Sequence, residues 1–275
     1  MLRVAMHGAA GRMGLAIARC ASEADDLVIS VALDHPGSKA LGLSSRELGG
    51  AGDVVLRSNL EAIGDVDVVI DFSAPAATAL LVEAAARLGK PVMIGTTGLD
   101  AAAKRAIDEA SEHVAIVVAP NTSVGVTVLF HLAAEAARLL GEDFDAEIVE
   151  MHHKHKVDAP SGTAVRLAER VAAARGVSLA EVSTHGRSGQ VGARPRGEIG
   201  VLALRGGDVI GDHTLVLAGP GERVELTHRA HDRSLFARGA LRAARWVAHA
   251  PRGLWDMTHV LGLAPVSRAE GATGA

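Results

Sequence analysis

Residues 2–14, LRVAMHGAAGRMG, run from an apolar stretch into a turn with three glycines and then into a segment with helical periodicity. This order predicts a buried strand over residues 2–6, a tight turn, and a helix over residues 13–22. Glycines let a backbone approach a bound group closely, and the amides at a helix N-terminus attract negative charge. We therefore expect a phosphate-binding turn at the start of a βαβ unit.

Asp34 supports this interpretation, because it follows the next predicted strand, residues 27–33. It lies 34 − 14 = 20 residues after Gly14, a spacing at which an acidic side chain accepts hydrogen bonds from an adenosine ribose. The glycine spacing is GxxGxxG rather than the commoner GxGxxG, and a purely structural turn is the alternative. The turn and the acid together predict a dinucleotide site formed by Gly8, Ala9, Ala10, Gly11, Arg12, Met13, Asp34 and His35.

The choice of cofactor depends on the charges around the ribose. The Asp34 carboxylate favours the free hydroxyls of NAD, because it repels a 2′-phosphate. His35 and Arg12 are near it in the predicted site and can offset that repulsion. The sequence therefore predicts NADH, NADPH or both as cofactors, with NADH used at least as well as NADPH.

The first half of the chain alternates short apolar runs with longer helical patterns, which is typical of βαβ units and a parallel sheet. Further strands are expected at residues 66–72, 91–94 and 114–119, and their nearly continuous apolar character fits burial on both faces. Ligands bind at the carboxyl ends of such strands, although an ordinary turn is the alternative there, and residues 71–73 are a weaker candidate. Small residues at these ends are predicted to complete the cofactor site: Gly95, Thr96, Thr97, Ala119, Pro120, Asn121 and Thr122.

After residue 121 the pattern changes. A helix is expected over residues 126–140, a strand over 146–151, and a helix over 163–175 with Ser161 as its N-cap. Residues 183–232 form strand-like runs separated by glycine turns, which predicts an antiparallel meander or a mixed sheet. The fold class is therefore α/β, with a Rossmann-like parallel-sheet dinucleotide-binding domain and a second α+β domain of mixed sheet.

Residues 147–164, EIVEMHHKHKVDAPSGTA, carry the strongest chemical signal. Histidines and lysines precede Ser-Gly-Thr, which opens a helix whose first amides form an anion site. Histidine titrates near neutral pH, and a lysine donates a proton when neighbouring cations depress its pKa. The segment predicts acid catalysis and carboxylate binding in a nicotinamide-dependent reductase of a small dicarboxylic substrate. Zinc binding and a basic surface loop are the alternatives, but paired cysteines and HExxH spacing are missing, so no metal is expected.

The composition argues against several other classes of protein. The net charge is −4, aromatic residues make up 2% and tyrosine is absent, which disfavours nucleic-acid binding. The longest apolar runs are judged far shorter than the roughly 18 residues of a membrane span, and the N-terminus has no signal-peptide pattern. Cys20 is the single cysteine and is expected to be buried. We expect a cytoplasmic enzyme with a small-molecule partner, no nucleic acid and no membrane.

The chain resembles the family of 4-hydroxy-tetrahydrodipicolinate reductase (dihydrodipicolinate reductase), an enzyme of lysine and diaminopimelate biosynthesis. The most specific stretch is HHKHKVDAPSGTA, and it is joined along nearly the whole chain by GAAGRMG, DFSAP, GTTG, APNTS, LRGGDVIGDHT and LWDM. The resemblance implies an NAD(P)H-dependent oxidoreductase. It would reduce 4-hydroxy-tetrahydrodipicolinate, via the cyclic imine dihydrodipicolinate with its two carboxylates, to tetrahydrodipicolinate.

The resemblance also implies roles for single residues. His152 matches the proton donor and acceptor, and Lys156 matches a second proton donor. His153, Gly162 and Thr163 match substrate-binding positions, the last two holding a carboxylate at a helix N-terminus. The segments 8–13, 95–97 and 119–122, together with Asp34, match the dinucleotide contacts. Two departures bear on the cofactor: His35 stands where many members have arginine, and Thr122 replaces a frequent phenylalanine.

The domain division follows from the same resemblance. Residues 1–123, completed by 234–263, form the dinucleotide-binding domain, and residues 124–233 form a substrate-binding and tetramerisation domain. A flexible tail is expected over residues 264–275, and the protein is expected to be a homotetramer.

Two rival functions differ in what they require of the sequence. A Rossmann dehydrogenase of an amino acid or a sugar would share the Gly8 turn but has no need of HHKHKVDAPSGT. A module that senses NAD(H) without turnover has no need of both His152 and Lys156. The sequence therefore favours the reductase over both rivals.

Overall fold

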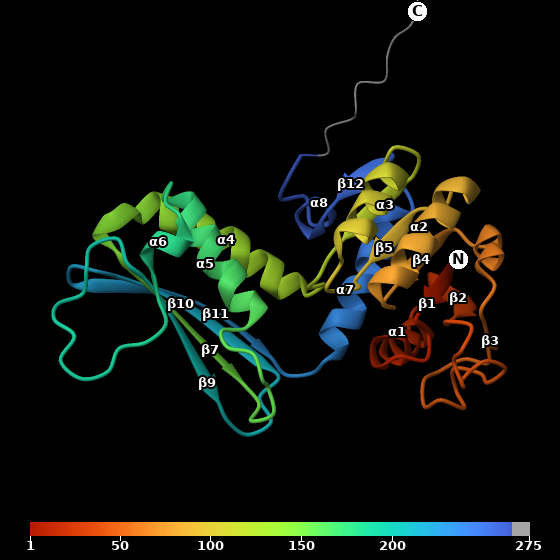
Figure 1. Ribbon diagram of the computed structural model, residues 1–275, viewed down its shortest axis with the longest axis horizontal. Coiled ribbons are helices and arrows are strands. Elements are labelled where there is room, and N and C mark those ends of the chain that lie inside the picture. The colour runs from red at the N-terminus through yellow and green to blue at the C-terminus, as the bar shows by residue number, and fades with distance from the viewer. Residues whose placement is uncertain (266–275) are drawn as a thin grey trace, which may run out of the picture. The chain divides into compact units, whose positions relative to one another are not determined.

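The computed structural model describes residues 1–265, and these fold as two compact units. The first unit is Met1–Val124 together with the described residues from Ser234 onward, and the second is Gly125–Arg233 (Figure 1). The roles predicted for the two domains stay predictions. Of the expected flexible tail, all but residues 264 and 265 lies outside the described residues.

The first unit is built on a parallel sheet. In the described part of the chain its strands are ordered β12-β6-β5-β4-β1-β2-β3, and every neighbouring pair is parallel. The carboxyl ends of the central strands therefore meet at one edge of the sheet, and the predicted Rossmann-like class is confirmed. The strands are β1 (Leu2–His7), β2 (Leu27–Leu33), β3 (Leu56–Arg57), β4 (Val68–Asp71), β5 (Val92–Ile94), β6 (Ala115–Val118) and β12 (Gly253–Trp255).

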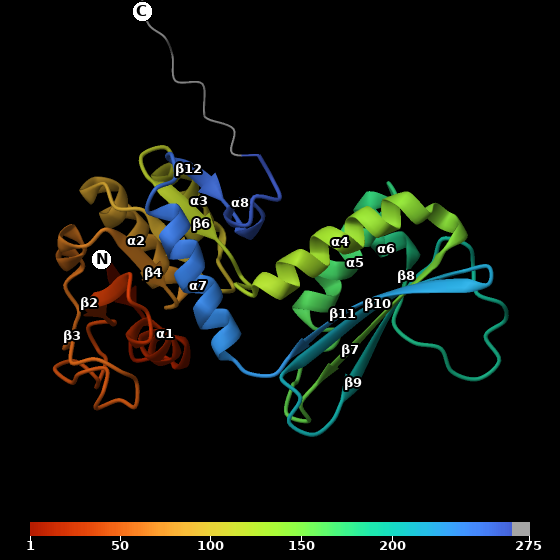
Figure 2. The same ribbon diagram turned by 180° about the vertical axis from the view of Figure 1, so that it is seen from behind.

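Helices cover both faces of this sheet (Figure 2). One apolar cluster joins Val4 and Met6 of β1 to Ile17 of the first helix, and a second joins Ala5 of β1 to Leu81 on the other face. Successive residues of a strand point to opposite faces, which explains why β1 is apolar throughout. The helical segments are α1 (Arg12–Ser22), η1 (Leu60–Asp65), α2 (Pro75–Leu88), α3 (Ala101–Ser111), α7 (Ser234–Val247) and α8 (Met257–Val260).

Two strands of this sheet were not predicted from the sequence. β3 has two residues and β12 has three, too few to show a period. β12 pairs with β6, so the chain returns to the first sheet after the second unit. The strand expected at residues 66–72 begins later, at Val68, because η1 (Leu60–Asp65) precedes it.

The second unit is a mixed sheet with helices packed on it. The strand order is β11-β10-β7-β9-β8; β7 pairs with β9 in parallel and with β10 antiparallel, so the prediction of a mixed sheet is confirmed. Helix α5 begins after Ser161, whose Oγ accepts from the Ala164 amide at 3.2 Å, which confirms the predicted N-cap. The elements are α4 (Val124–Leu140), η2 (Gly141–Asp143), β7 (Asp145–His152), α5 (Gly162–Ala174), α6 (Leu179–Val182), β8 (Ser183–Thr184), β9 (Ile199–Arg205), β10 (Gly211–Gly219) and β11 (Glu222–Ala230).

Helix α4 corrects one expectation from the sequence. By length and composition Val124–Asp143, 20 residues with a mean hydropathy of 1.4 over its window, is apolar enough to cross a membrane. The expectation that all apolar runs are far too short was therefore wrong. The helix packs Leu129, Ala133 and Ala137 into the core of the second unit. Core helices pass the same test, so the stretch is weak evidence for a membrane span.

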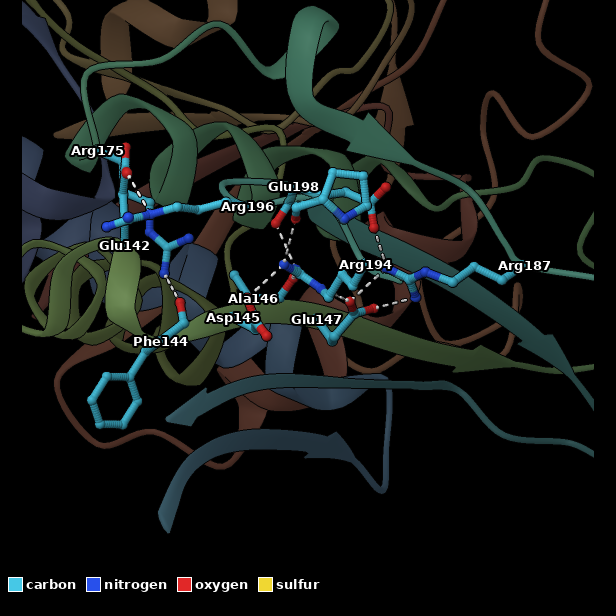
Figure 3. A network of polar contacts seen from close by, with 11 residues as sticks. Glu142, Phe144, Asp145, Ala146, Glu147, Arg175, Arg187, Arg194, Arg196 and Glu198 are labelled. Atoms are coloured by element: carbon cyan, nitrogen blue, oxygen red, sulfur yellow. Dashed lines mark hydrogen bonds and ion pairs between the residues drawn. The ribbon is translucent and has the colours of Figure 1, made fainter. Parts of the chain in front are cut away.

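A long loop between β8 and β9 is anchored to β7 by two arginines (Figure 3). Arg194 donates to Glu147 Oε1 at 2.9 Å and to Asp145 Oδ1 at 2.7 Å, and Arg187 donates to both oxygens of Glu147. Although burial opposes it, the hydrogen bonds from Arg187 and Arg194 hold the pKa of Glu147 below its ordinary value. Gly200 on β9 leaves room for this carboxylate, since a Cβ there would lie 1.9 Å from Glu147 Oε2.

Candidate active site

The glycine turn after β1 is shaped by close contacts of the backbone. Gly8 has φ +78°, and a Cβ on it would lie 2.3 Å from the carbonyl oxygen of Phe72. A Cβ on Gly14 would lie 2.5 Å from the carbonyl oxygen of Gly8. Helix α1 begins with Gly11 as its N-cap, and no side chain caps its first amides. These amides are therefore available to an anion, which fits the pyrophosphate of a dinucleotide.

Asp34 lies beside this turn, as predicted. Its Oδ2 accepts from the Ala10 amide at 3.0 Å and its Oδ1 accepts from the His35 amide at 2.8 Å. Each oxygen retains a lone pair for a ribose hydroxyl. The His35 ring is largely exposed, with Nε2 3.9 Å from Asp34 Oδ1, and Arg12 is exposed. Asp34 is therefore held beside the glycine turn, His35 lies next to it, and Arg12 is exposed at the start of α1.

Asp71 is a buried acid beside the predicted cofactor loops, and its hydrogen-bond partners were not predicted from the sequence. It ends β4 and is fully buried, and its carboxylate has four side-chain partners. His7 Nδ1 lies 2.8 Å from Oδ1, and Ser73 Oγ donates to the same oxygen at 2.6 Å. Thr78 and Thr96 donate their hydroxyls to Oδ2 at 2.5 and 2.8 Å. A buried acid at the end of an all-apolar strand was the available signal.

The Asp71 cluster connects three loops of the predicted cofactor site. His7 precedes the glycine turn, Ser73 lies in the DFSAP stretch, and Thr96 lies in GTTG, where its Oγ1 also accepts from the Ser73 amide at 2.9 Å. Burial works against the charge, but the hydrogen bond from His7 and those from the hydroxyls keep the pKa of Asp71 below its ordinary value. The carboxylate therefore stays ionised and fixes the relative positions of the three loops.

The remaining predicted cofactor residues differ in how far their side chains are exposed to solvent. Thr97 and Pro120 are exposed, and they line one pocket of the first unit together with Thr96. Thr122 is 2% exposed, and its hydroxyl donates to the carbonyl of Phe236 at 2.7 Å. The Thr122 side chain is therefore buried and hydrogen-bonded within the first unit. This role was not predicted when Thr122 was noted as a replacement for phenylalanine.

In the second unit, Glu150 and His152 lie on the same face at the end of β7. The Glu150 side chain is fully buried, and its Oε2 lies 2.6 Å from His152 Nδ1. Arg205 on the neighbouring β9 donates to both Glu150 oxygens, at 2.8 and 2.9 Å, and the Ser161 amide donates to Oε1 at 3.0 Å. Burial works against the charge, but the hydrogen bonds from Arg205, His152 and Ser161 lower the pKa of Glu150. Glu150 is therefore an ionised acceptor.

His213 on β10 completes this cluster. Its ring packs edge-on against His152 with centroids 5.2 Å apart, and its Nε2 lies 3.1 Å from Ser161 Oγ. Burial, assisted by repulsion from His152, lowers the pKa of His213 to about 4. His213 is therefore neutral near pH 7. No role for His213, Arg205 or Glu150 was predicted from the sequence.

Lys156 lies in the loop after β7, but its surroundings differ from those expected. Its Nζ donates to both carboxylate oxygens of Asp158, at 2.8 and 2.9 Å. From the sequence, neighbouring cations were expected to act on this ammonium, whereas its hydrogen-bond partner is an anion. The ion pair lowers the pKa of Asp158, whose carbonyl oxygen accepts from Arg205 at 2.7 Å. Lys156 is thus tied to the same arginine that holds Glu150.

The predicted substrate-binding residues lie near this cluster in the chain. Gly162 and Thr163 form the first turn of α5, and a Cβ on Gly162 would meet nothing within 4 Å. His153 lines a pocket of the second unit together with Lys154, His155 and Arg233. Asp208 also lines this pocket, but the basic side chains outnumber this one acid, which suits an anionic ligand. The open helix N-terminus and the basic pocket are both suited to carboxylates.

Two protein-family models together match nearly the whole chain. The family described as "Dihydrodipicolinate reductase, N-terminus" matches residues 2–122, and "Dihydrodipicolinate reductase, C-terminus" matches residues 125–261. A 4-hydroxy-tetrahydrodipicolinate reductase of Anaeromyxobacter dehalogenans is 47% identical, covering 96% of this chain and 98% of the relative. One of Thiobacillus denitrificans is 48% identical, covering 95% and 99%.

Solved structures agree with this placement. A dipicolinate-bound dihydrodipicolinate reductase from Paenisporosarcina sp. TG-14 superposes with a TM-score of 0.76 at 26% identity, covering 93% of this chain and 97% of that one. A myo-inositol dehydrogenase from Corynebacterium glutamicum reaches 0.53 at 16% identity, covering 92% and 90%, and shares the fold alone. The chain therefore belongs to the dihydrodipicolinate reductase family, a family of oxidoreductases in lysine and diaminopimelate biosynthesis.

Proposed function

We propose that this protein acts on 4-hydroxy-tetrahydrodipicolinate, which loses water to give dihydrodipicolinate, and that it reduces dihydrodipicolinate to tetrahydrodipicolinate with a nicotinamide cofactor as the source of hydride. The names of relatives that match nearly the full length of the chain support this substrate. The observation that carries the proposal is the connected cluster in the second unit. There Arg205 donates both to Glu150, which contacts His152, and to the carbonyl of Asp158. Asp158 in turn accepts from Lys156, so the two proposed proton donors belong to one hydrogen-bonded cluster.

His152 and Lys156 are proposed as proton donors. When hydride adds to an unsaturated cyclic imine, electron density accumulates on the nitrogen or on an enamine carbon, and a proton must follow. An imidazolium or an ammonium group can supply it, and such help is worth about 10²–10⁴ in rate. The two residues thus divide proton supply between a group anchored on β7 and a group in the loop that follows.

Substrate carboxylates are proposed to bind at the start of α5 and beside His153. Gly162 and Thr163 present the first turn of the helix, where backbone amides and the helix dipole favour an anion. Because Gly162 has open space around it, a carboxylate can approach its backbone. The basic pocket at His153 supplies positive charge for a second carboxylate.

NADH and NADPH are both proposed as cofactors, with NADH used at least as well. Asp34 has oxygens free for the ribose hydroxyls of NADH, and its charge opposes a 2′-phosphate. The exposed side chains of His35 and Arg12 can partly offset that charge. When bound, the cofactor supplies the hydride; the chain supplies the glycine turn, the first amides of α1 and the loops fixed by Asp71.

A cytoplasmic homotetramer, formed through the sheet of the second unit, is proposed as the working assembly. The apolar cluster of that unit joins the sheet to α4 and α5, and exposed side chains alternate along β11 (Glu222–Ala230). Light scattering on the purified protein tests this: a mass of four chains is expected, and a single-chain mass would contradict it.

The catalytic roles are tested by following NADH oxidation with the condensation product of pyruvate and aspartate semialdehyde. His152→Ala and Lys156→Ala should each lower kcat about 10²- to 10⁴-fold and leave NADH affinity, measured by fluorescence, unchanged. Arg105→Ala, an exposed change on α3 of the first unit, serves as a control with near wild-type turnover. Wild-type turnover of the His152→Ala, Lys156→Ala double variant would refute the assignment.

A further inference from the structure

Glu150 occupies a position where the strand pattern calls for an apolar residue. Along β7 the buried residues are Ala146, Ile148 and Glu150, and the first two lie in the apolar core of the second unit. His152 follows on the same face, because alternate residues of a strand share a face. A fully buried carboxylate is costly unless it is completely hydrogen-bonded. Its place next to His152 therefore calls for an explanation.

The four donors around Glu150 determine which His152 nitrogen carries a proton. A carboxylate only accepts hydrogen bonds, and Glu150 remains ionised for the reasons given above. Its Oε2 lies 2.6 Å from His152 Nδ1, so this nitrogen must carry a hydrogen and donate it. In the neutral ring Nε2 is then the free base, and in the charged ring Nε2 holds the second proton.

The residue opposite His152 leaves room beside Nε2, because it is a glycine. Gly211 on β10 faces it, and a Cβ at that position would lie 2.9 Å from Nε2. His213 packs edge-on against the ring and is neutral near pH 7, so it adds no competing cation. A glycine beside a histidine nitrogen is what a site needs if that nitrogen is to meet a ligand.

We infer that Glu150 is a positioning residue for the reduction: it holds His152 with its proton on Nδ1 and so reserves Nε2 for proton exchange with the substrate. Arg205 keeps the Glu150 carboxylate in place with two hydrogen bonds. The same guanidinium donates to the Asp158 carbonyl and so couples the position of the Lys156 loop to this anchor. The inference rests on the proposed function, because it assigns a task to the environment of His152.

Glu150→Gln is the informative substitution, because neither orientation of the amide fits. At the place of Oε2 its NH₂ group would face donors from His152 and Arg205, and at the place of Oε1 it would face donors from Ser161 and Arg205. The ring is then expected to lose its fixed tautomer. We expect kcat to fall about 10- to 100-fold, which does not exceed the rate enhancement that general acid catalysis typically supplies. The KM for NADH should stay unchanged.

Glu147→Gln is the matched control. Glu147 lies on the same strand and is also paired with two arginines, but three residues earlier and on the other face of the sheet. It should keep the wild-type kcat. If Glu150 acted only in stability, both variants would lose thermal stability and neither would change the histidine. Nitrogen-15 NMR of His152 separates the cases, since it distinguishes a protonated Nδ1 from a protonated Nε2.

The expected result is an Nδ1-protonated His152 in the wild type and in Glu147→Gln, and a mixture of tautomers in Glu150→Gln. An Nε2-protonated ring in the wild type, or an unchanged ring and kcat in Glu150→Gln, would overturn the inference. If Glu150→Gln does not fold, Gly211→Ala serves instead: it should lower kcat by obstructing Nε2 while the Nδ1 proton remains, and an unchanged kcat would also overturn it. Full turnover in His152→Ala, by contrast, would refute the catalytic role proposed for His152, but it would not contradict the assignment of the His152 proton to Nδ1.

Discussion

Replacing Asp71 by asparagine removes half of the acceptors that join the loops of the cofactor site. The carboxylate accepts from His7, Ser73, Thr78 and Thr96, and the asparagine NH₂ group would face two of these donors. Hydrogen bonds to a charged group contribute about 1.5–3 kcal/mol each. A hydroxyl can turn and accept instead, but Thr96 Oγ1 already accepts from the Ser73 amide. We therefore expect a loss of roughly 2–4 kcal/mol in the free energy of unfolding.

The pH dependence of this loss has a definite sign. The pKa of Asp71 is lowered in the folded protein, so its stabilising contribution is present above the unfolded pKa of about 3.9. The contribution disappears as the pH falls through the folded pKa. The difference between wild type and Asp71→Asn should therefore be largest near pH 7 and shrink in acid below the unfolded value.

Urea unfolding, followed by tryptophan fluorescence, measures the free energy of unfolding of the first unit. The two tryptophans of the chain, Trp246 on α7 and Trp255 on β12, both lie in the first unit, with ring centroids 5.9 Å apart. Asp53→Asn is the control, because its pair with Arg46 is highly exposed and should contribute at most about 1 kcal/mol. A loss no larger in Asp71→Asn than in Asp53→Asn would refute the reasoning.

Two further substitutions test the cofactor site. Gly8→Ala forces a side chain onto a backbone with φ +78° and places a Cβ 2.3 Å from the Phe72 carbonyl, so NADH affinity in a fluorescence titration should fall by at least about tenfold. Gly49→Ala has φ +86° without any close neighbour and should keep NADH affinity; equal affinities in the two variants would argue against the turn. His35→Arg adds a permanent cation near the ribose and should raise the NADPH to NADH ratio of kcat/KM by roughly tenfold. An unchanged ratio would mean that residue 35 does not contact the 2′-phosphate.

The parallel sheet and the phosphate-binding turn could be predicted because their signals are local. Residues 2–14 hold a strand, a turn and a helix start in one short stretch, and Asp34 follows at the expected spacing. The N-cap Ser161 was predictable for the same reason, since a cap bonds within its own helical turn. The short strands β3 and β12 were not, because two or three residues show no period.

The polar clusters could not be derived from spacing. Asp71 gathers partners from residue 7 to residue 96, and Glu150 meets Arg205, 55 positions later, because β7 and β9 pair in parallel with His152 opposite Arg205. Strand pairing decides such neighbours, and no local pattern encodes which strands pair. The surroundings of Lys156 were misjudged for a related reason: the cations next to it in sequence suggested a cationic environment, whereas its ammonium donates to the Asp158 carboxylate.

The sequence alone thus determined the order of elements, the chemistry of the glycine turn and the candidates His152 and Lys156, since each depends on residues close together in the chain. Tertiary structure decided which nitrogen of His152 is held and which loops Asp71 joins. The physical reason is that a buried charge requires several donors, and one short segment cannot supply them all.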